Sequence, residues 1–239
     1  MGLYEQIFLR KSCRSYQMEP LPATQLQEIE AFVSGMRPLL PGVSIGHRAM
    51  GPGQIKGLLA PKAPHYFVLT GRPQPYRDLC AGFLFQQLDL YLSGQGLGSC
   101  WLGAARGRGT PFGADDILAI SFGRPAVAPT RTVEAFKRKP LSAIATGEDP
   151  RLEAARLAPS GMNAQPWYFI AQEGVIHVYQ AVPRGPMAKL YRFQELDVGI
   201  ALCHLALASE AHGLSFQFEP KQENAPQAPH GFTYVGTVM

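Results

Sequence analysis

The sequence lacks the signals that identify several large classes of protein. It has no uninterrupted apolar run long enough to cross a membrane, and its N-terminus has no apolar core of a secretion signal. We therefore expect a cytoplasmic protein with no membrane partner. Its four cysteines, Cys13, Cys80, Cys100 and Cys203, are widely scattered, without a CxxC pair or a metal-ligand spacing. This pattern argues against a disulfide framework and favours free thiols in a reducing compartment.

A strong charge excess is also missing. Lys and Arg number 22 against 18 Asp and Glu, which gives a net charge of +4 and a pI of about 8.9. The densest basic clusters, Arg106-Gly107-Arg108 and Lys137-Arg138-Lys139, accompany no recognised nucleic-acid-binding module, and a cofactor phosphate would explain them equally well. We therefore expect no nucleic-acid partner. The six histidines form no HExxH pattern, so we also expect no metal.

Apolar material, by contrast, is sufficient for one or two cores, since 46% of the 239 residues are hydrophobic. Helical patterns that are apolar nearly all round cover Leu79–Leu92 and Asp197–His212. Short apolar strands are expected at 117–123 and 232–236. Another apolar stripe at helical spacing follows Thr24, which stands at the start of a capping-box pattern.

The most informative segment is Ala158-Pro159-Ser160-Gly161-Met162-Asn163-Ala164-Gln165-Pro166-Trp167. It closes a helical pattern and enters an apolar strand, with a hydroxyl, an amide and little bulk between them. Such a turn can press backbone and short polar groups against a flat, hydrogen-bonding ligand. The same residue types are ordinary turn formers, so local chemistry also allows a simple chain reversal with Trp167 in the core.

Two further segments are ambiguous when read alone. Arg10-Lys11-Ser12-Cys13-Arg14-Ser15-Tyr16 offers guanidinium groups and a hydroxyl donor, which suit a phosphate and a polyol. Its alternative interpretation is a solvated basic turn after a short helix. Gly96-Leu97-Gly98-Ser99-Cys100-Trp101-Leu102-Gly103 ends a long helix with glycines that permit close backbone approach to a planar ligand. Its alternative is a helix C-cap, with Gly96 or Gly98 in the left-handed conformation.

Together the three segments resemble the APSxxNxQPW, RRSxRxF and GLGTCWIGG signatures of the FMN-dependent nitroreductase family. Lys11 stands where the family has a second Arg, which keeps the charge but loses a planar fork. Ala104 replaces a second Gly but still offers its backbone N–H. The resemblance implies an α+β, nitroreductase-like fold with a mixed, mostly antiparallel sheet and packed helices.

The resemblance also implies a cofactor and its ligands. FMN would accept hydride from NAD(P)H at N5 and reduce a small electron-poor acceptor, such as a nitroaromatic or a quinone. Because the flavin carries the chemistry, no catalytic side chain is expected. Arg138 resembles the family's late basic residue at the phosphate, with a solvated basic loop as the alternative. The implied cofactor-binding residues are Arg10, Lys11, Ser12, Arg14, Trp101, Leu102, Gly103, Ala104, Arg138, Pro159, Ser160, Gly161, Asn163 and Gln165.

The chain also repeats itself weakly, in the order strand, long helix, Gly-Leu and strand. The matched positions are Pro64 and Pro166, Gly82 and Gly199, and Gly96-Leu97 and Gly213-Leu214. We therefore expect two nitroreductase-like halves, residues 1–147 and 148–239, that form a pseudo-dimer within one chain. The arrangement resembles that of the single-chain, internally duplicated subgroup of the family.

One flavin site is expected to survive in this pseudo-dimer. The apparent counterpart of the Ser-Gly-Met-Asn turn, Leu58 to Lys62, lacks both the Ser and the Asn, and the start of the second half lacks the basic turn. The chain is then a monomer or a weak homo-oligomer with one FMN. Two alternatives stay open: another flavin redox chemistry on the same fold, and a flavin-binding or sensory protein without turnover.

Overall fold

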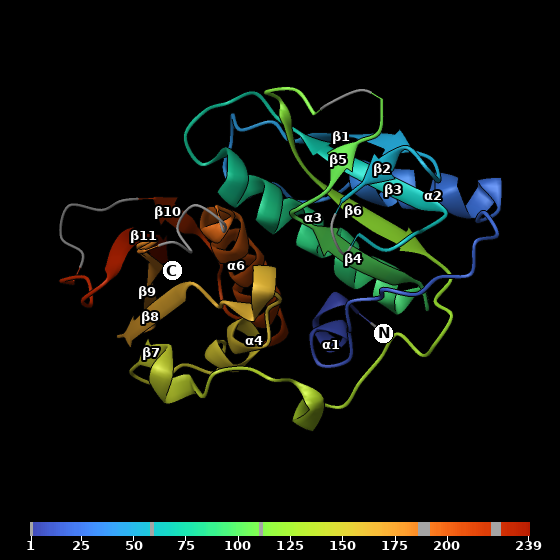
Figure 1. The fold of residues 1–239 in the computed structure, drawn as a ribbon. Coiled ribbons are helices and arrows are strands. Elements are labelled where there is room, and N and C mark those ends of the chain that lie inside the picture. The colour runs from blue at the N-terminus through green and yellow to red at the C-terminus, as the bar shows by residue number, and fades with distance from the viewer. Residues whose placement is uncertain (1, 58–59, 110–111, 186–191, 221–225) are drawn as a thin grey trace.

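The computed structural model describes residues 2–57, 60–109, 112–185, 192–220 and 226–239. Two sheets lie on either side of two long central helices, α3 (Arg77–Gly94) and α6 (Gln194–Ala211) (Figure 1). This arrangement confirms the expected α+β class, with antiparallel sheets and packed helices. The remaining helices and 3-10 turns are α1 (Leu3–Ile7), α2 (Ala23–Ser34), η1 (Val133–Ala135), η2 (Leu141–Ala143), α4 (Leu152–Arg156) and η3 (Gly161–Asn163).

The first sheet has the strand order β1-β3-β6-β4, and all neighbouring strands are antiparallel. Alternate residues of β3 and β6 face opposite sides, and both sides are buried. Phe67 and Phe122 pack in the cluster that contains the long helices, whereas Val68 and Ala119 pack with Ile55. The strands are β1 (Gly46–Met50), β3 (His65–Thr70), β4 (Gly98–Leu102) and β6 (Asp116–Gly123), with a separate ribbon of β2 (Ile55–Lys56) and β5 (Arg106–Gly107).

The second sheet has the strand order β10-β11-β9-β8-β7. Its pairs are antiparallel except that β7 runs parallel to β8. Trp167, Phe169 and Val178 are buried in the same cluster as the two long helices, so both sheets contribute to one core. The strands are β7 (Ala145–Thr146), β8 (Trp167–Gln172), β9 (Val175–Ala181), β10 (Phe218–Pro220) and β11 (Phe232–Val238).

The two long helices approach each other at a pair of glycines. A Cβ added at Gly82 would overlap the carbonyl group of Leu196 in α6. The contact is reciprocal, because a Cβ added at Gly199 would overlap the carbonyl group of Leu79 in α3. Such an exchange of identical contacts is characteristic of a two-fold-related pair of surfaces. Glycine at both positions lets the helix backbones touch, and both helices are buried over most of their length as a result.

Both helices also end in the same way. Gly96 and Gly213 have positive φ angles of 71° and 66°. Beyond them, Leu97 N donates to Leu92 O at 2.9 Å and Leu214 N donates to Ser209 O at 2.8 Å. This is the Schellman pattern, in which the left-handed residue lets the chain bond back to an unpaired helix carbonyl. The helix-cap interpretation of Gly96 is therefore confirmed.

The sheet order corrects the expected match between strands. Along the sheets, β1-β3-β6-β4 corresponds to β8-β9-β11-β10, so the strand after Pro64 takes the place of β9 rather than β8. Residues 35–45, which precede β1, therefore stand in the place of the turn before β8. The segment matched from the sequence, Leu58 to Lys62, precedes the wrong strand, and residues 58–59 lie outside the described part of the chain.

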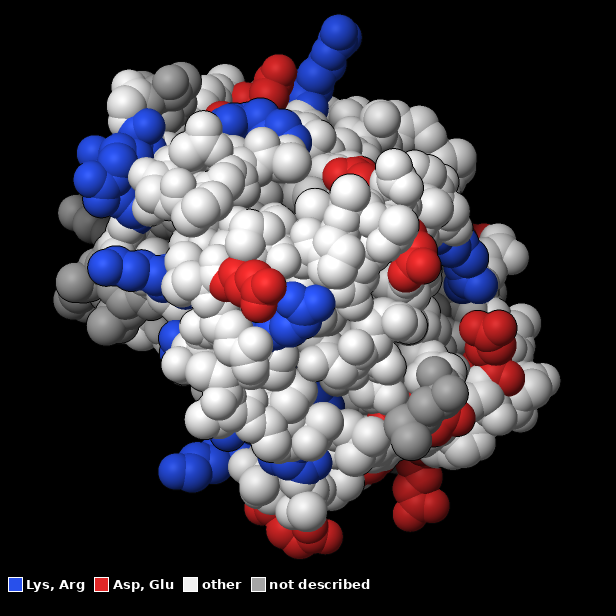
Figure 2. Space-filling model, turned by 90° about the vertical axis from the view of Figure 1, so that its right-hand side faces the viewer, with Lys and Arg blue, Asp and Glu red and all other residues white. Residues whose placement is uncertain are grey.

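The described surface carries both signs of charge in small separate areas. On the face shown in Figure 2, Lys and Arg lie mostly toward the left and the top, Asp and Glu lie mostly toward the right and the bottom, and wide uncharged areas separate the groups. Among the described residues, no helix is both long and apolar enough to cross a membrane.

Candidate functional site

A cavity of about 110 Å³ opens where the three informative segments of the sequence meet. The basic turn contributes one side of it, β4 a second, and the turn before β8 a third, while Phe193 and the start of α6 complete the wall. The cavity thus combines residues from both expected halves. Its lining residues are Ser12, Arg14, Cys100, Trp101, Gly103, Leu118, Pro159, Ser160, Gly161, Met162, Phe193, Leu196, Asp197 and Ile200.

The turn before β8 has an unusual backbone. Met162, Asn163 and Gln165 all have positive φ angles, of 54°, 57° and 50°. Non-glycine residues seldom adopt this conformation, and it persists where surrounding contacts hold it. Two hydrogen bonds within the turn do so: Gln165 N donates to Ser160 Oγ at 2.9 Å, and Gln165 Nε2 donates to Asn163 O at 3.0 Å. A simple chain reversal does not require three such residues.

The basic segment Lys137-Arg138-Lys139 is bonded to this turn. Arg138 Nη1 donates to Asn163 Oδ1 at 2.5 Å, and Asn163 Nδ2 donates to Lys137 O at 2.6 Å. Lys139 N donates to Gln165 Oε1 at 2.8 Å. The structure therefore brings Arg138, Asn163 and Gln165 together in one network, although none of the three lines the cavity itself.

Arg10 occupies a different environment from the one expected. Its side chain is buried, with Nε 3.0 Å from Asp89 Oδ2 in α3 and Nη2 donating to Ser12 Oγ at 3.1 Å. Ser99 Oγ donates to the other oxygen of Asp89. Arg10 thus connects the basic turn to α3 and orients Ser12, which does line the cavity. Lys11 and Ala104 are exposed and Leu102 is buried, and all three lie outside the lining.

Three guanidinium groups gather behind the turn. Arg131 Nε donates to Arg10 O at 3.2 Å, and its Cζ lies 3.6 Å from the ring centre of Phe136, with Arg138 Cζ at 5.6 Å from the same ring. Burial, and then the charges of Arg131, Arg10 and Arg156, lower the pKa of Arg138 to about 10. Burial and Arg10 lower the pKa of Arg131 to about 10 as well. Positive charge is therefore under-compensated at this place.

Several buried donors in this region lack a hydrogen-bond partner within the described chain. They include Trp101 Nε1, which belongs to a residue of the cavity lining, and Arg138 Nε, with Arg10 Nε and Trp167 Nε1 as the others. A buried donor without an acceptor costs free energy, so an unpaired donor in a native site calls for an explanation. An anionic, acceptor-rich ligand supplies one, because it would pair with both kinds of group. The residues present therefore fit a phosphate-bearing aromatic cofactor.

Asp197 is a buried carboxyl group in the cavity wall. Gly161 N donates to its Oδ1 at 3.2 Å and to its Oδ2 at 3.0 Å. Burial raises the pKa of Asp197 well above its ordinary value, and the hydrogen bond from Gly161 only partly opposes this effect. Burial thus favours the neutral form of the carboxyl group, whose oxygens fix the backbone of the turn through Gly161.

The substitution Asp197→Asn should therefore stabilise the protein increasingly as the pH rises. The ordinary pKa of Asp, 3.8, applies to the unfolded chain, and the pKa of Asp197 in the folded protein is higher. The neutral acid therefore contributes fully to stability below pH 3.8, and this contribution is lost as the pH rises through the folded-state pKa. Asn keeps an oxygen for Gly161 but cannot ionise. We expect the Tm of the variant to exceed that of the wild type by a few degrees at pH 8, with the gap closing toward pH 4. Asp115→Asn, at an exposed site, is the control, and a gap independent of pH would contradict the assignment.

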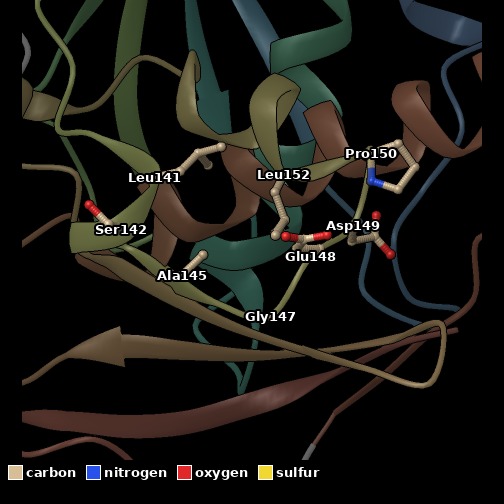
Figure 3. A pocket seen from close by; sticks show the side chains of 8 residues that line it. All are labelled: Leu141, Ser142, Ala145, Gly147, Glu148, Asp149, Pro150 and Leu152. Carbon is tan, nitrogen blue, oxygen red and sulfur yellow. The ribbon is translucent and has the colours of Figure 1, made fainter.

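Another hollow, of about 480 Å³, lies at the expected border between the halves (Figure 3). Glu148 and Asp149 line it together with small and apolar residues from η2 and α4. The carboxylate of Asp149 is already paired with Arg151, at 2.7 Å from Nη2 and 2.8 Å from Nε. This hollow contains none of the residues that the sequence predicted for the site. Among the described residues, no group of His, Cys, Asp and Glu is arranged to hold a metal ion.

Sequence reasoning missed part of the cavity wall. Phe193, Leu196, Asp197 and Ile200 come from the start of α6, whose pattern indicated only a buried helix. Arg131 was also missed, since it stands alone between two threonines and belongs to none of the three segments. An unexplained charge at the start of an otherwise apolar helix was the available signal for Asp197.

Comparisons with known proteins show the family and the fold of the chain. A family model described as "Putative TM nitroreductase" matches residues 2–209. A Thermotoga maritima structure described as a "putative nitroreductase" is 20% identical to this protein. The match covers 100% of this chain and 93% of the Thermotoga chain, with a TM-score of 0.70, which shows a shared fold. No curated protein matches the sequence.

Two solved nitroreductases with bound FMN are also similar over part of the chain. The one from Desulfovibrio desulfuricans is 15% identical and covers 62% of this chain and 98% of its own, with a TM-score of 0.46. The one from Bacteroides fragilis is 16% identical and covers 59% of this chain and 98% of its own, with a TM-score of 0.43. These partial matches do not carry the family assignment, which depends on the family model that spans residues 2–209. This protein belongs to the nitroreductase family.

Proposed function

We propose that this protein binds FMN in the cavity beside the turn before β8 and transfers reducing equivalents from NAD(P)H to a small electron-poor acceptor. The observation that carries the proposal is the meeting of the three segments around one cavity, with Trp101 Nε1 and Arg138 Nε unpaired nearby. FMN is bound in two solved nitroreductases that resemble this chain. When bound, the flavin supplies the hydride chemistry.

The residues of this chain then bind and orient the cofactor. Of the three guanidinium groups behind the turn, Arg131 and Arg138 have no acidic partner among the described residues. These two would hold the phosphate, with Ser12 and Arg14 nearer the cavity. Arg10 acts as a positioning residue through Ser12. The remaining candidates, Trp101, Leu102, Gly103, Ala104, Pro159, Ser160, Gly161, Asn163 and Gln165, would form the walls along the ring and the ribityl chain or support them.

We further propose that residues 1–147 and 148–239 are the two halves of an internal pseudo-dimer. The reciprocal contacts of Gly82 and Gly199 and the identical helix ends support this interpretation. Residues 35–45, the topological counterpart of the turn before β8, contain no Asn and no Gln. One functional flavin site per chain follows, since only one of the two pseudo-equivalent places has the residues that would form it.

The absorbance spectrum of the purified protein tests the proposal directly. We expect a yellow protein with flavin bands, about one FMN per chain, and bleaching when NADH or NADPH is added without oxygen. A colourless protein that does not take up added FMN would contradict the cofactor assignment. Two FMN per chain would contradict the single site. Flavin that binds but stays oxidised with both nucleotides would favour a binding protein without turnover.

A further inference from the structure

A second, larger cavity of about 620 Å³ adjoins the candidate flavin site. Phe193 lines both cavities, and its ring covers Gly103, where an added Cβ would lie 3.0 Å from Phe193 Cε2. The wall of the second cavity is formed by the start of α3, β5, the residues before β6 and the residues before α6. A molecule in this cavity therefore lies next to the candidate flavin site.

The carboxylates in this second cavity are already neutralised. Asp78 Oδ1 accepts from Arg77 Nε at 2.8 Å. Asp116 is held by both ends of the Arg48 guanidinium, at 3.2 Å from Nε and 2.9 Å from Nη2. The bidentate pair leaves Asp116 little remaining capacity for a ligand cation, and the single bond from Arg77 offsets the charge of Asp78.

Two arginines in the same wall have no acidic partner among the described residues. Arg106 is exposed, and its Nη1 donates only to Ala105 O, the carbonyl of the preceding residue, at 2.7 Å. Arg192 is exposed, with its Cζ 5.5 Å from the ring centre of Phe193. The cavity therefore has a net positive charge, and its donors have the planar fork that binds a carboxylate or phosphate. Phe112 and Phe193 add aromatic faces beside these donors.

We propose that this second cavity binds the anionic group of an aromatic electron acceptor, whose reducible part reaches the flavin site past Phe193. The inference rests on the proposed function, because it names the substrate class of that site: nitroaromatics or quinones that carry a carboxylate, sulfonate or phosphate. The phosphate of the nucleotide donor has the same chemistry, and the experiment below distinguishes the two sources.

The test compares 4-nitrobenzoate with its neutral isostere 4-nitrobenzamide. Dissociation constants are measured by ligand-observed NMR on the oxidised protein without NAD(P)H, so that no turnover occurs. We expect 4-nitrobenzoate to bind more tightly than the amide, and the double substitution Arg106→Gln with Arg192→Gln to weaken it about tenfold, with salt reducing the difference. The control is Arg108→Gln, which removes the same charge just beyond β5 at a residue outside the lining, and it should leave the preference for the anion in place.

Each outcome has a distinct meaning. Equal affinities of the wild type for the two ligands, or an unchanged preference in the double variant, would overturn the inference. The oxidised nucleotides NADP+ and NAD+ are measured in the same way. If the double substitution weakens NADP+ relative to NAD+ but leaves the preference for 4-nitrobenzoate unchanged, the cavity belongs to the nucleotide donor and the inference is overturned. Flavin content is read from absorbance in parallel. A flavin-free protein that still prefers 4-nitrobenzoate supports the anion site, while the proposed function fails. A yellow protein without this preference overturns the anion site alone.

Discussion

The substitution Gly82→Ala is expected to lower the free energy of unfolding by about 3 kcal/mol or more, because the new methyl group would overlap the carbonyl group of Leu196. The obstacle is backbone rather than the end of a flexible side chain, so the two helices must separate. A loss of this size is a large part of the total stability of a typical domain. Urea unfolding followed by circular dichroism measures it.

The reciprocal geometry provides two comparisons for this experiment. Gly199→Ala should cost about as much, since its methyl group would overlap the carbonyl group of Leu79. Gly94→Ala is the matched control in the same helix, where the nearest atom to an added Cβ is Gln6 Cγ at 3.6 Å, an ordinary contact. The control should be neutral or stabilise by about 0.5–1 kcal/mol, as Ala does relative to Gly in a helix. If Gly82→Ala behaves like Gly94→Ala, the close crossing of α3 and α6 is wrong.

The substitution Arg138→Gln should weaken FMN binding by about tenfold to a hundredfold, the range for loss of a charge-assisted hydrogen bond to a phosphate. The pKa of Arg138 is lowered in the flavin-free protein by burial and by neighbouring arginines, so its charge is unfavourable there until an anion binds. We therefore expect the Tm of the flavin-free protein to change little while flavin affinity falls. Quenching of flavin fluorescence on binding gives the dissociation constant.

Arg156→Gln provides the control for Arg138. Arg156 also lowers the pKa of Arg138, but its own guanidinium is paired with Glu153, at 2.5 Å between Nη2 and Oε1, on the surface of α4. Its removal should change FMN affinity by less than about threefold, in keeping with a partly exposed ion pair. Equal affinities of the wild type and Arg138→Gln would show that Arg138 does not hold the phosphate.

Several parts of the fold could be predicted because their causes are local. The two long helices and the strands at 117–123 and 232–236 follow from continuous apolar patterns, and Gly96 follows from the need for a left-handed residue after a helix. The expected capping box at Thr24 was wrong, because α2 begins at Ala23, after Pro22, and Thr24 already lies inside the helix without a capping hydrogen bond.

Other parts could not be predicted because they depend on distant residues. The strand after Pro64 resembles β8 in sequence, but hairpin order decides its place in the sheet, and no short pattern carries that information. Arg10 carried the right charge for a phosphate, yet its guanidinium is paired with Asp89 of α3, 79 residues away along the chain and in a helix whose pattern indicated only burial. Which cation binds a ligand and which supports the fold is decided by the partner that folding brings to it.

The contact between α3 and α6 within one chain also has an evolutionary consequence. In an assembly of two identical subunits every substitution appears on both sides of the interface, and dilution can separate the sides. Here each side has its own codons, and the peptide chain keeps both together at any protein concentration. Asp197 precedes Gly199 by the same spacing that separates Cys80 from Gly82. In the proposed internal pseudo-dimer, an acid that suits one wall of the cavity can thus be kept there alone, while the corresponding place in α3 is a buried thiol.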